Sequence, residues 1–89
     1  MTPLAPYVVL IMDDALLSRI TSDPAVMAGK PVVRGTRLTV EFLLGLLASG
    51  ATPEDIQHEY SGLHDEDLRA CLLFASRALA DSSFMPLAA

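Results

Sequence analysis

The sequence predicts a mainly α domain, namely a helix-turn-helix-like three-helix bundle preceded by a short N-terminal β-strand and a small β-hairpin. Three helix-start patterns carry this prediction, at Thr39, at residues 52–55 and at residues 65–67. A glycine follows each of the first two helical segments, so the connections between helices are only a few residues long. The 89 residues can form only one hydrophobic core, and we therefore expect a single domain over residues 1–89.

Residues 1–18 are expected to form an N-terminal extension with one strand and one short helical turn. The segment 7–11 is rich in β-forming residues, and Asp13 and Asp14 can begin a turn of helix that runs to Leu17. An exposed apolar strand needs a partner, and the same segment of a second copy can supply one. The alternative is that this segment is a mobile apolar tail.

The segment 29–40, GKPVVRGTRLTV, predicts the hairpin. Two very short strands, residues 31–33 and 37–38, flank a turn at Gly35. Pro31 has no amide donor, so it suits only an edge or the first position of its strand. Upstream, Asp23 and Pro24 predict a separate turn.

Three helices are expected in the second half of the chain. Thr39 can cap the first helix, and Gly50 can end it in the left-handed conformation. The run TPED at 52–55 is a capping-box pattern with proline at the first helical position, and it begins the second helix. Three acids at 65–67 complement the dipole of a third helix, which runs to about Ala80.

The third helix is expected to bury one apolar face, formed by Leu68, Cys71, Leu72, Ala75 and Leu79, against Ile56, Tyr60 and Leu63. Hydrophobic residues make up 52% of the chain, more than so small a core can hold, so part of them should be covered by another subunit. We expect a homodimer, with an interface that includes Tyr7, Val9, Ile11, Leu73 and Phe74.

The charges are unevenly distributed along the chain. The formal net charge is -5, yet Arg19, Lys30, Arg34 and Arg37 fall within one short stretch, and eight of the eleven acids lie from Glu41 onward. These four cations are the candidate binding residues for a partner or for nucleic acid. Arginine suits carboxylates and phosphates equally, so they can bind an acidic protein site, a nucleic-acid backbone or the chain's own acids.

The usual constellations of catalytic or ligand-binding residues are absent from the sequence. His58 and His64 lack the spacing of a helical metal pair, and Cys71 has no neighbouring base in the sequence. The glycines match no phosphate-binding loop. We therefore expect no enzymatic activity, no cofactor, no metal site and no small-molecule substrate.

The sequence also bears on where the protein resides. The longest apolar run is far shorter than the roughly 20 residues that span a bilayer. No Lys or Arg precedes Arg19, and a lone cysteine cannot form an intramolecular disulfide. A cytoplasmic protein without membrane contact is the expectation.

The stretch from Leu17 to Ala78 resembles domain-of-unknown-function family 433 (DUF433). The matching motif pieces are Asp23-Pro24, Gly29-Lys30-Pro31, Arg34-Gly35-Thr36-Arg37, Val40, Gly50, Pro53-Glu54-Asp55-Ile56 and Asp67-Leu68. The family-like part is expected over residues 19–80, and residues 81–89 are a C-terminal tail. His64 stands where the family pattern usually has a hydroxyl cap, and the segment through Met12 lies outside the match.

The resemblance implies a trihelical, helix-turn-helix-like fold with a short β-element and a dimeric habit. For part of the family it also implies a VapB-like role as antitoxin beside a nuclease toxin of the PIN type. In that role Arg34 or Arg37 would displace Mg²⁺ or neutralise the carboxylates that hold it, and the dimer could also bind operator DNA. The competing hypotheses are a stand-alone helix-turn-helix transcriptional regulator and a structural interaction protein whose arginines form internal salt bridges.

Overall fold

The computed structural model describes residues 13–81, and within them the chain is mainly helical with one two-stranded antiparallel sheet. A helical turn at 13–17 comes first. It is followed by β1 (Ile20–Thr21), the short turn η1 (Met27–Gly29), β2 (Val32–Val33), α2 (Val40–Ala48), α3 (Pro53–Glu59) and α4 (Asp65–Ala80). The strand predicted at 7–11 lies outside the described residues. No helix within residues 13–81 is both long and apolar enough to cross a membrane.

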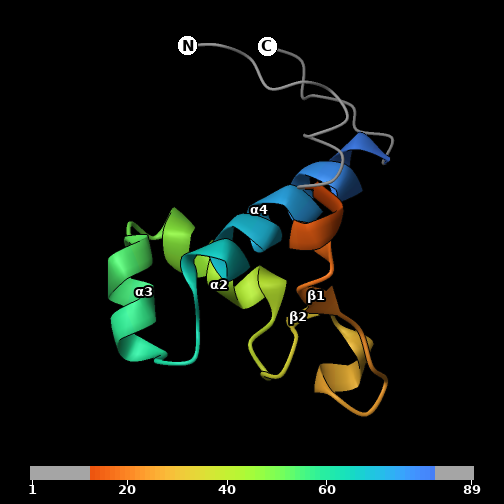
Figure 1. The fold of residues 1–89 in the computed structure, drawn as a ribbon, viewed down its shortest axis with the longest axis horizontal. Coiled ribbons are helices and arrows are strands. Elements are labelled where there is room, and N and C mark those ends of the chain that lie inside the picture. Colours follow the sequence, from red (N-terminus) through yellow and green to blue (C-terminus); the bar gives the residue numbers. More distant parts are fainter. Residues whose placement is uncertain (1–12, 82–89) are drawn as a thin grey trace.

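The long helix α4 organises the molecule. Figure 1 shows it running across the structure, with α3 beside its first turns and the two strands below its second half. It packs against α2, β1 and α3. The core lies between these elements and consists of Val33, Val40, Leu43, Ile56, Leu63, Leu68 and Cys71.

The helix starts predicted at Thr39 and at 52–55 are confirmed. Thr39 Oγ1 accepts a hydrogen bond from the Phe42 amide at 3.0 Å. Thr52 and Asp55 form a reciprocal capping box, in which each side chain bonds the other residue's amide, at 3.1 and 2.9 Å. These bonds satisfy amide donors that have no partner within the helix, which is why such local patterns mark the beginnings of the helices.

Gly50 ends α2 as expected, with a φ of +101°. Replacing Gly50 with Ala should destabilise the protein by about 1–2 kcal/mol, because an alanine Cβ clashes with the backbone in the left-handed region. Gly45 is the matched control. It lies inside α2, a Cβ there would meet no atom within 4 Å beyond the local backbone of its own helix, and Gly45→Ala should stabilise the helix by about 0.5–1 kcal/mol. Urea unfolding of the two variants measures both effects, and a loss of stability in both would contradict the prediction.

The predicted hairpin requires a correction. Val32 and Val33 form β2, but their ladder partner is β1, with Ile20 opposite Val33 and Thr21 opposite Val32. Residues 37–38 form no strand, although the chain does turn back after Gly35, and Val32 makes an isolated bridge with Thr39. The sequence prediction missed β1 because a two-residue strand carries almost no pattern of its own.

The buried face of α4 also differs from the prediction. Leu68 and Cys71 are buried as expected, but Leu72 and Leu79 are 52% and 63% exposed. Phe74, which was not expected on the buried face, packs partly against the core, and its place at a dimer interface stays a prediction. The difference arises because α4 covers α2 and β1 as well as α3, so its inward face is rotated toward Phe74.

The segment that leads into β2 adopts an uncommon conformation. Met27, Ala28 and Gly29 all have positive φ, at 49°, 57° and 80°. Backbone hydrogen bonds from Gly29 to Val26 and from Lys30 to Met27 close the turn. This left-handed turn carries Lys30 to the start of α2.

Candidate functional site: a cationic turn

The candidate site is the turn formed by residues 34–37, here called the cationic turn. The Thr36 amide and hydroxyl both donate to the Val33 carbonyl, at 3.0 and 2.8 Å. Gly35 has a φ of +81°, a backbone angle that glycine adopts readily and that residues with a side chain rarely adopt. The Leu38 amide donates to Thr36 Oγ1 at 3.0 Å. The turn therefore has a defined backbone.

The two strands anchor the cationic turn to the rest of the domain. The Arg34 amide donates to the Arg19 carbonyl at 2.7 Å, and the Val33 amide donates to the Leu38 carbonyl at 3.0 Å. Val33 itself is buried in the core. Figure 1 shows the turn as the loop between β2 and α2, projecting away from the helices.

The structure separates the four candidate cations into two kinds. Arg19 forms an ion pair with Asp67 at 3.0 Å, and Lys30 forms one with Glu41 at 2.9 Å. Arg34 and Arg37 are exposed, and neither forms an ion pair with any residue between 13 and 81. Of these four cations, only the two on the cationic turn lack an ion pair among the described residues.

The pair formed by Arg19 and Asp67 is a structural link that the sequence analysis missed. The Asp67 side chain is only 8% exposed, and its second oxygen accepts a hydrogen bond from the His64 amide at 2.9 Å. The Asp67 carboxylate therefore caps α4 and also holds Arg19, whose carbonyl accepts the hydrogen bond from the Arg34 amide in the cationic turn. The only sequence signal was an acid at the third position of a helix, which also fits a simple capping role.

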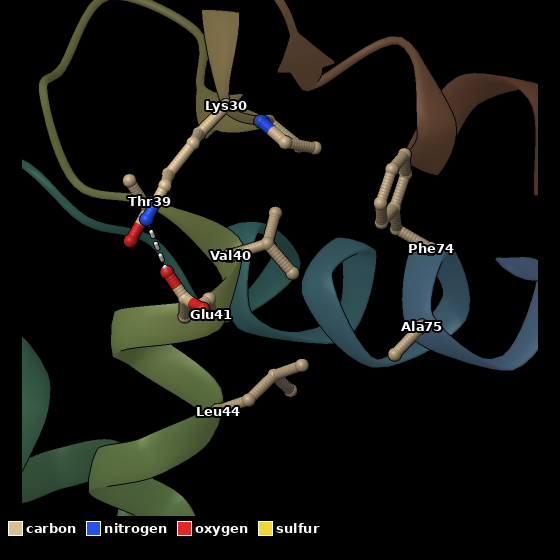
Figure 2. Close-up of a pocket in the computed structure, with 8 residues that line it drawn as sticks. Lys30, Thr39, Val40, Glu41, Leu44, Phe74 and Ala75 are labelled. Atoms are coloured by element: carbon tan, nitrogen blue, oxygen red, sulfur yellow. Dashed lines mark hydrogen bonds and ion pairs between the residues drawn. The ribbon is translucent and has the colours of Figure 1, made fainter. Parts of the chain in front are cut away.

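The second ion pair lies at the rim of a pocket between α2 and α4. Figure 2 shows Lys30 and Glu41 on one side, with Val40, Leu44, Phe74 and Ala75 around the hollow. The volume is about 260 Å³. The hydrogen bond and charge of Lys30 lower the pKa of Glu41, so both rim groups are charged and satisfy each other. Apart from this ion pair and Thr39, the residues that line the pocket are apolar.

The other predicted interface and reactive residues lie partly outside the described part of the chain. Leu73 and Phe74 are half-buried on α4, whereas Tyr7, Val9 and Ile11 lie outside the described residues. Between residues 13 and 81, no three histidine, cysteine or acidic side chains come together in a way that could hold a metal ion. His58 and His64 lie on the surface, and Cys71 is completely buried.

Burial raises the pKa of the Cys71 thiol to about 11, and the negative charge of Asp67 adds to this effect. Because only the thiolate reacts, iodoacetamide at pH 8 should alkylate Cys71 at least about a hundredfold more slowly in the folded protein than in urea. Mass spectrometry over time measures both rates. Equal rates in the two states would show that Cys71 is accessible and ionisable in the folded domain.

Comparison with known proteins gives a family and a fold. The model of the family described as "Protein of unknown function (DUF433)" matches residues 20–75, which include the cationic turn. Uncharacterized protein y4eO of Sinorhizobium fredii (strain NBRC 101917 / NGR234) is 33% identical over 66 residues. This stretch is 72% of the present chain but only 30% of that relative. A crystal structure of a DUF433 member protein from Anabaena variabilis has a TM-score of 0.67 and 28% identity, covering 86% of this chain and 79% of that one.

Proposed function

This chain belongs to the DUF433 family of proteins of unknown function, and from its surface we propose that it is a non-enzymatic protein-binding module. Its cationic turn docks on carboxylates of a protein partner. The observation that carries this proposal is the contrast among the four clustered cations. Arg19 and Lys30 are paired internally, while Arg34 and Arg37 are exposed and form no ion pair within residues 13–81.

The architecture of the turn suits recognition of paired carboxylates. Its backbone is held by hydrogen bonds within residues 33–38 and by the bond from Arg34 to Arg19. A backbone that is already ordered reduces the entropy lost on binding. Each guanidinium can form two parallel hydrogen bonds to a carboxylate, so two arginines on one short turn match a site with several acids.

We propose a nuclease toxin of the PIN type as the partner, with this chain as its antitoxin. Such an enzyme holds Mg²⁺ with clustered carboxylates, and arginines placed among them compete with the metal for the same oxygens. The partner class rests on the family resemblance. The cationic turn is the feature of this chain that fits the chemistry.

A protein partner fits the charges better than DNA does. A helix-turn-helix reading would place the first turn of α3 or α4 near phosphates. Those turns carry Glu54 and Asp55 on α3 and Asp65 and Glu66 on α4, all exposed. They would repel the backbone. The attraction would have to come from arginines outside these first turns, Arg34 and Arg37 among them.

The test is affinity capture from the native cells with the tagged full chain, after nuclease treatment and a high-salt wash. The double variant Arg34→Ala/Arg37→Ala should lose the partner. Charge-assisted hydrogen bonds contribute about 1.5–3 kcal/mol each, so the affinity should fall at least about a hundredfold. Arg69→Ala, an exposed arginine on α4 without an ion pair among the described residues, is the matched control and should retain it.

A captured protein with a carboxylate-lined nuclease site, inhibited by the wild-type chain and not by the double variant, would support the antitoxin role. Retention of the same partner by the double variant would overturn the proposed contact. Tight, sequence-specific binding of a short DNA duplex by the isolated chain, lost in the same variant, would assign the turn to DNA instead.

A further inference from the structure

A second feature of the surface complements the cationic turn. A pocket of about 190 Å³, here called the α3 pocket, lies beside α3 and is lined by Leu46, Ala51, Asp55, Ile56, Glu59 and Tyr60. Leu46, Ala51 and Tyr60 are half-buried, and Ile56 is buried, so the floor is apolar. Asp55 and Glu59 are exposed at its edge.

The carboxylates at this edge are not part of an ion pair among the described residues. Neither Asp55 nor Glu59 forms an ion pair with any residue between 13 and 81. Asp55 Oδ2 accepts the Thr52 amide, and this bond lowers the pKa of Asp55 and keeps it ionised. The other oxygen of Asp55 and the whole Glu59 carboxylate remain available to a cation from another molecule.

We propose that the α3 pocket receives an arginine of the cationic turn from a second copy of this chain. The methylene stem of arginine packs on apolar surface while its charged end stays at the rim. That rim offers the carboxylates of Asp55 and Glu59, which attract a guanidinium by charge. It also offers the ring of Tyr60, which attracts a guanidinium through a cation–π interaction. The chain thus carries the two complementary halves of one contact.

Charge complementarity selects a second copy as the occupant. Each copy presents two exposed arginines on its cationic turn and two exposed carboxylates at the edge of its α3 pocket. None of these four side chains forms an ion pair within residues 13–81 of its own chain. Two copies that exchange their turns close a two-fold dimer with two identical contacts. Such a dimer shields Arg34 and Arg37, so self-association and docking on an acidic partner exclude each other. The contact does not depend on what that partner is.

Analytical ultracentrifugation of the full chain at low ionic strength tests this contact with a charge swap. One variant reverses the turn, Arg34→Glu/Arg37→Glu, and another reverses the pocket, Glu59→Arg. The wild type should move with rising concentration from the 9.5 kDa of one chain toward twice that mass, and salt should oppose the shift. Each variant alone should stay at the mass of one chain. An equimolar mixture of the two should regain the wild-type shift, because both complementary pairs are then restored.

Two controls make the result specific. Glu54→Arg removes the same charge from the same helix, but Glu54 does not line the pocket, so this variant should associate like the wild type. Circular dichroism checks that all variants fold. The inference is overturned if the wild type stays at the mass of one chain, if Glu59→Arg associates normally, or if the mixture fails to associate. The Glu59→Arg variant keeps the cationic turn and should still capture the acidic partner, so failure here is distinguishable from failure of the proposed function.

Discussion

Replacing Leu43 with Ala is expected to lower the free energy of unfolding by about 2–5 kcal/mol. Leu43 lies in the middle of α2, is 0% exposed and belongs to the core cluster under α4. Truncation removes buried methyl groups and leaves a cavity that the surrounding helices can fill only partly. A domain of this size has roughly 5–10 kcal/mol of stability in total, so a large share should disappear.

Urea unfolding followed by circular dichroism measures this effect, and Leu79 supplies the matched control. Leu79 is a leucine within a helix as well, but it is 63% exposed. Its truncation removes little buried surface and should change stability by less than about 0.5 kcal/mol. If the two variants lost equal stability, the assignment of Leu43 to the core and of Leu79 to the surface would be wrong.

Replacing Asp67 with Ala should destabilise the protein by about 2–4 kcal/mol. The change removes both the acceptor for the His64 amide and the partner of Arg19. Breaking a fully buried ion pair costs about 3–5 kcal/mol. Arg19 is 37% exposed, so water can solvate its guanidinium after the change, and the cost of breaking this ion pair is smaller than that of a fully buried one. Loss of the helix cap adds about 1 kcal/mol.

Thermal and urea unfolding of three variants separates these contributions. Asp65→Ala removes a neighbouring acid that is exposed in the same turn, so it should cost only about 0.3–1 kcal/mol. Asp67→Asn keeps an oxygen that can cap α4 but removes the charge that holds Arg19. Its stability should lie between those of the wild type and Asp67→Ala. Equal stability of Asp67→Ala and Asp65→Ala would show that the link to Arg19 is unimportant.

These contacts also bear on the proposed binding surface. Arg19 was a candidate binding residue together with Arg34 and Arg37, but its guanidinium is engaged with Asp67 and its carbonyl holds the Arg34 amide. Arg19 therefore supports the backbone of the cationic turn. Lys30 is similarly engaged with Glu41. The binding proposal accordingly rests on Arg34 and Arg37 alone.

What the sequence by itself determined is the set of helices and their ends. Thr39 and the pattern at 52–55 begin α2 and α3, and three acids begin α4. Gly50 ends α2. All these features depend on hydrogen bonds or backbone preferences within four residues along the chain, so the residues involved are adjacent in the sequence and can be recognised there.

Only the tertiary structure decided which strand pairs with β2, which face of α4 is buried and which of the candidate cations form ion pairs within residues 13–81. β2 pairs with β1 rather than with residues 37–38. The bond between Arg19 and Asp67 joins residues 48 positions apart, and the one between Arg77 and Asp13 joins residues 64 positions apart. Six basic and eleven acidic residues allow many such pairings. Their choice depends on how α4 crosses the sheet, because charged side chains pair only where packing brings them within a few ångströms.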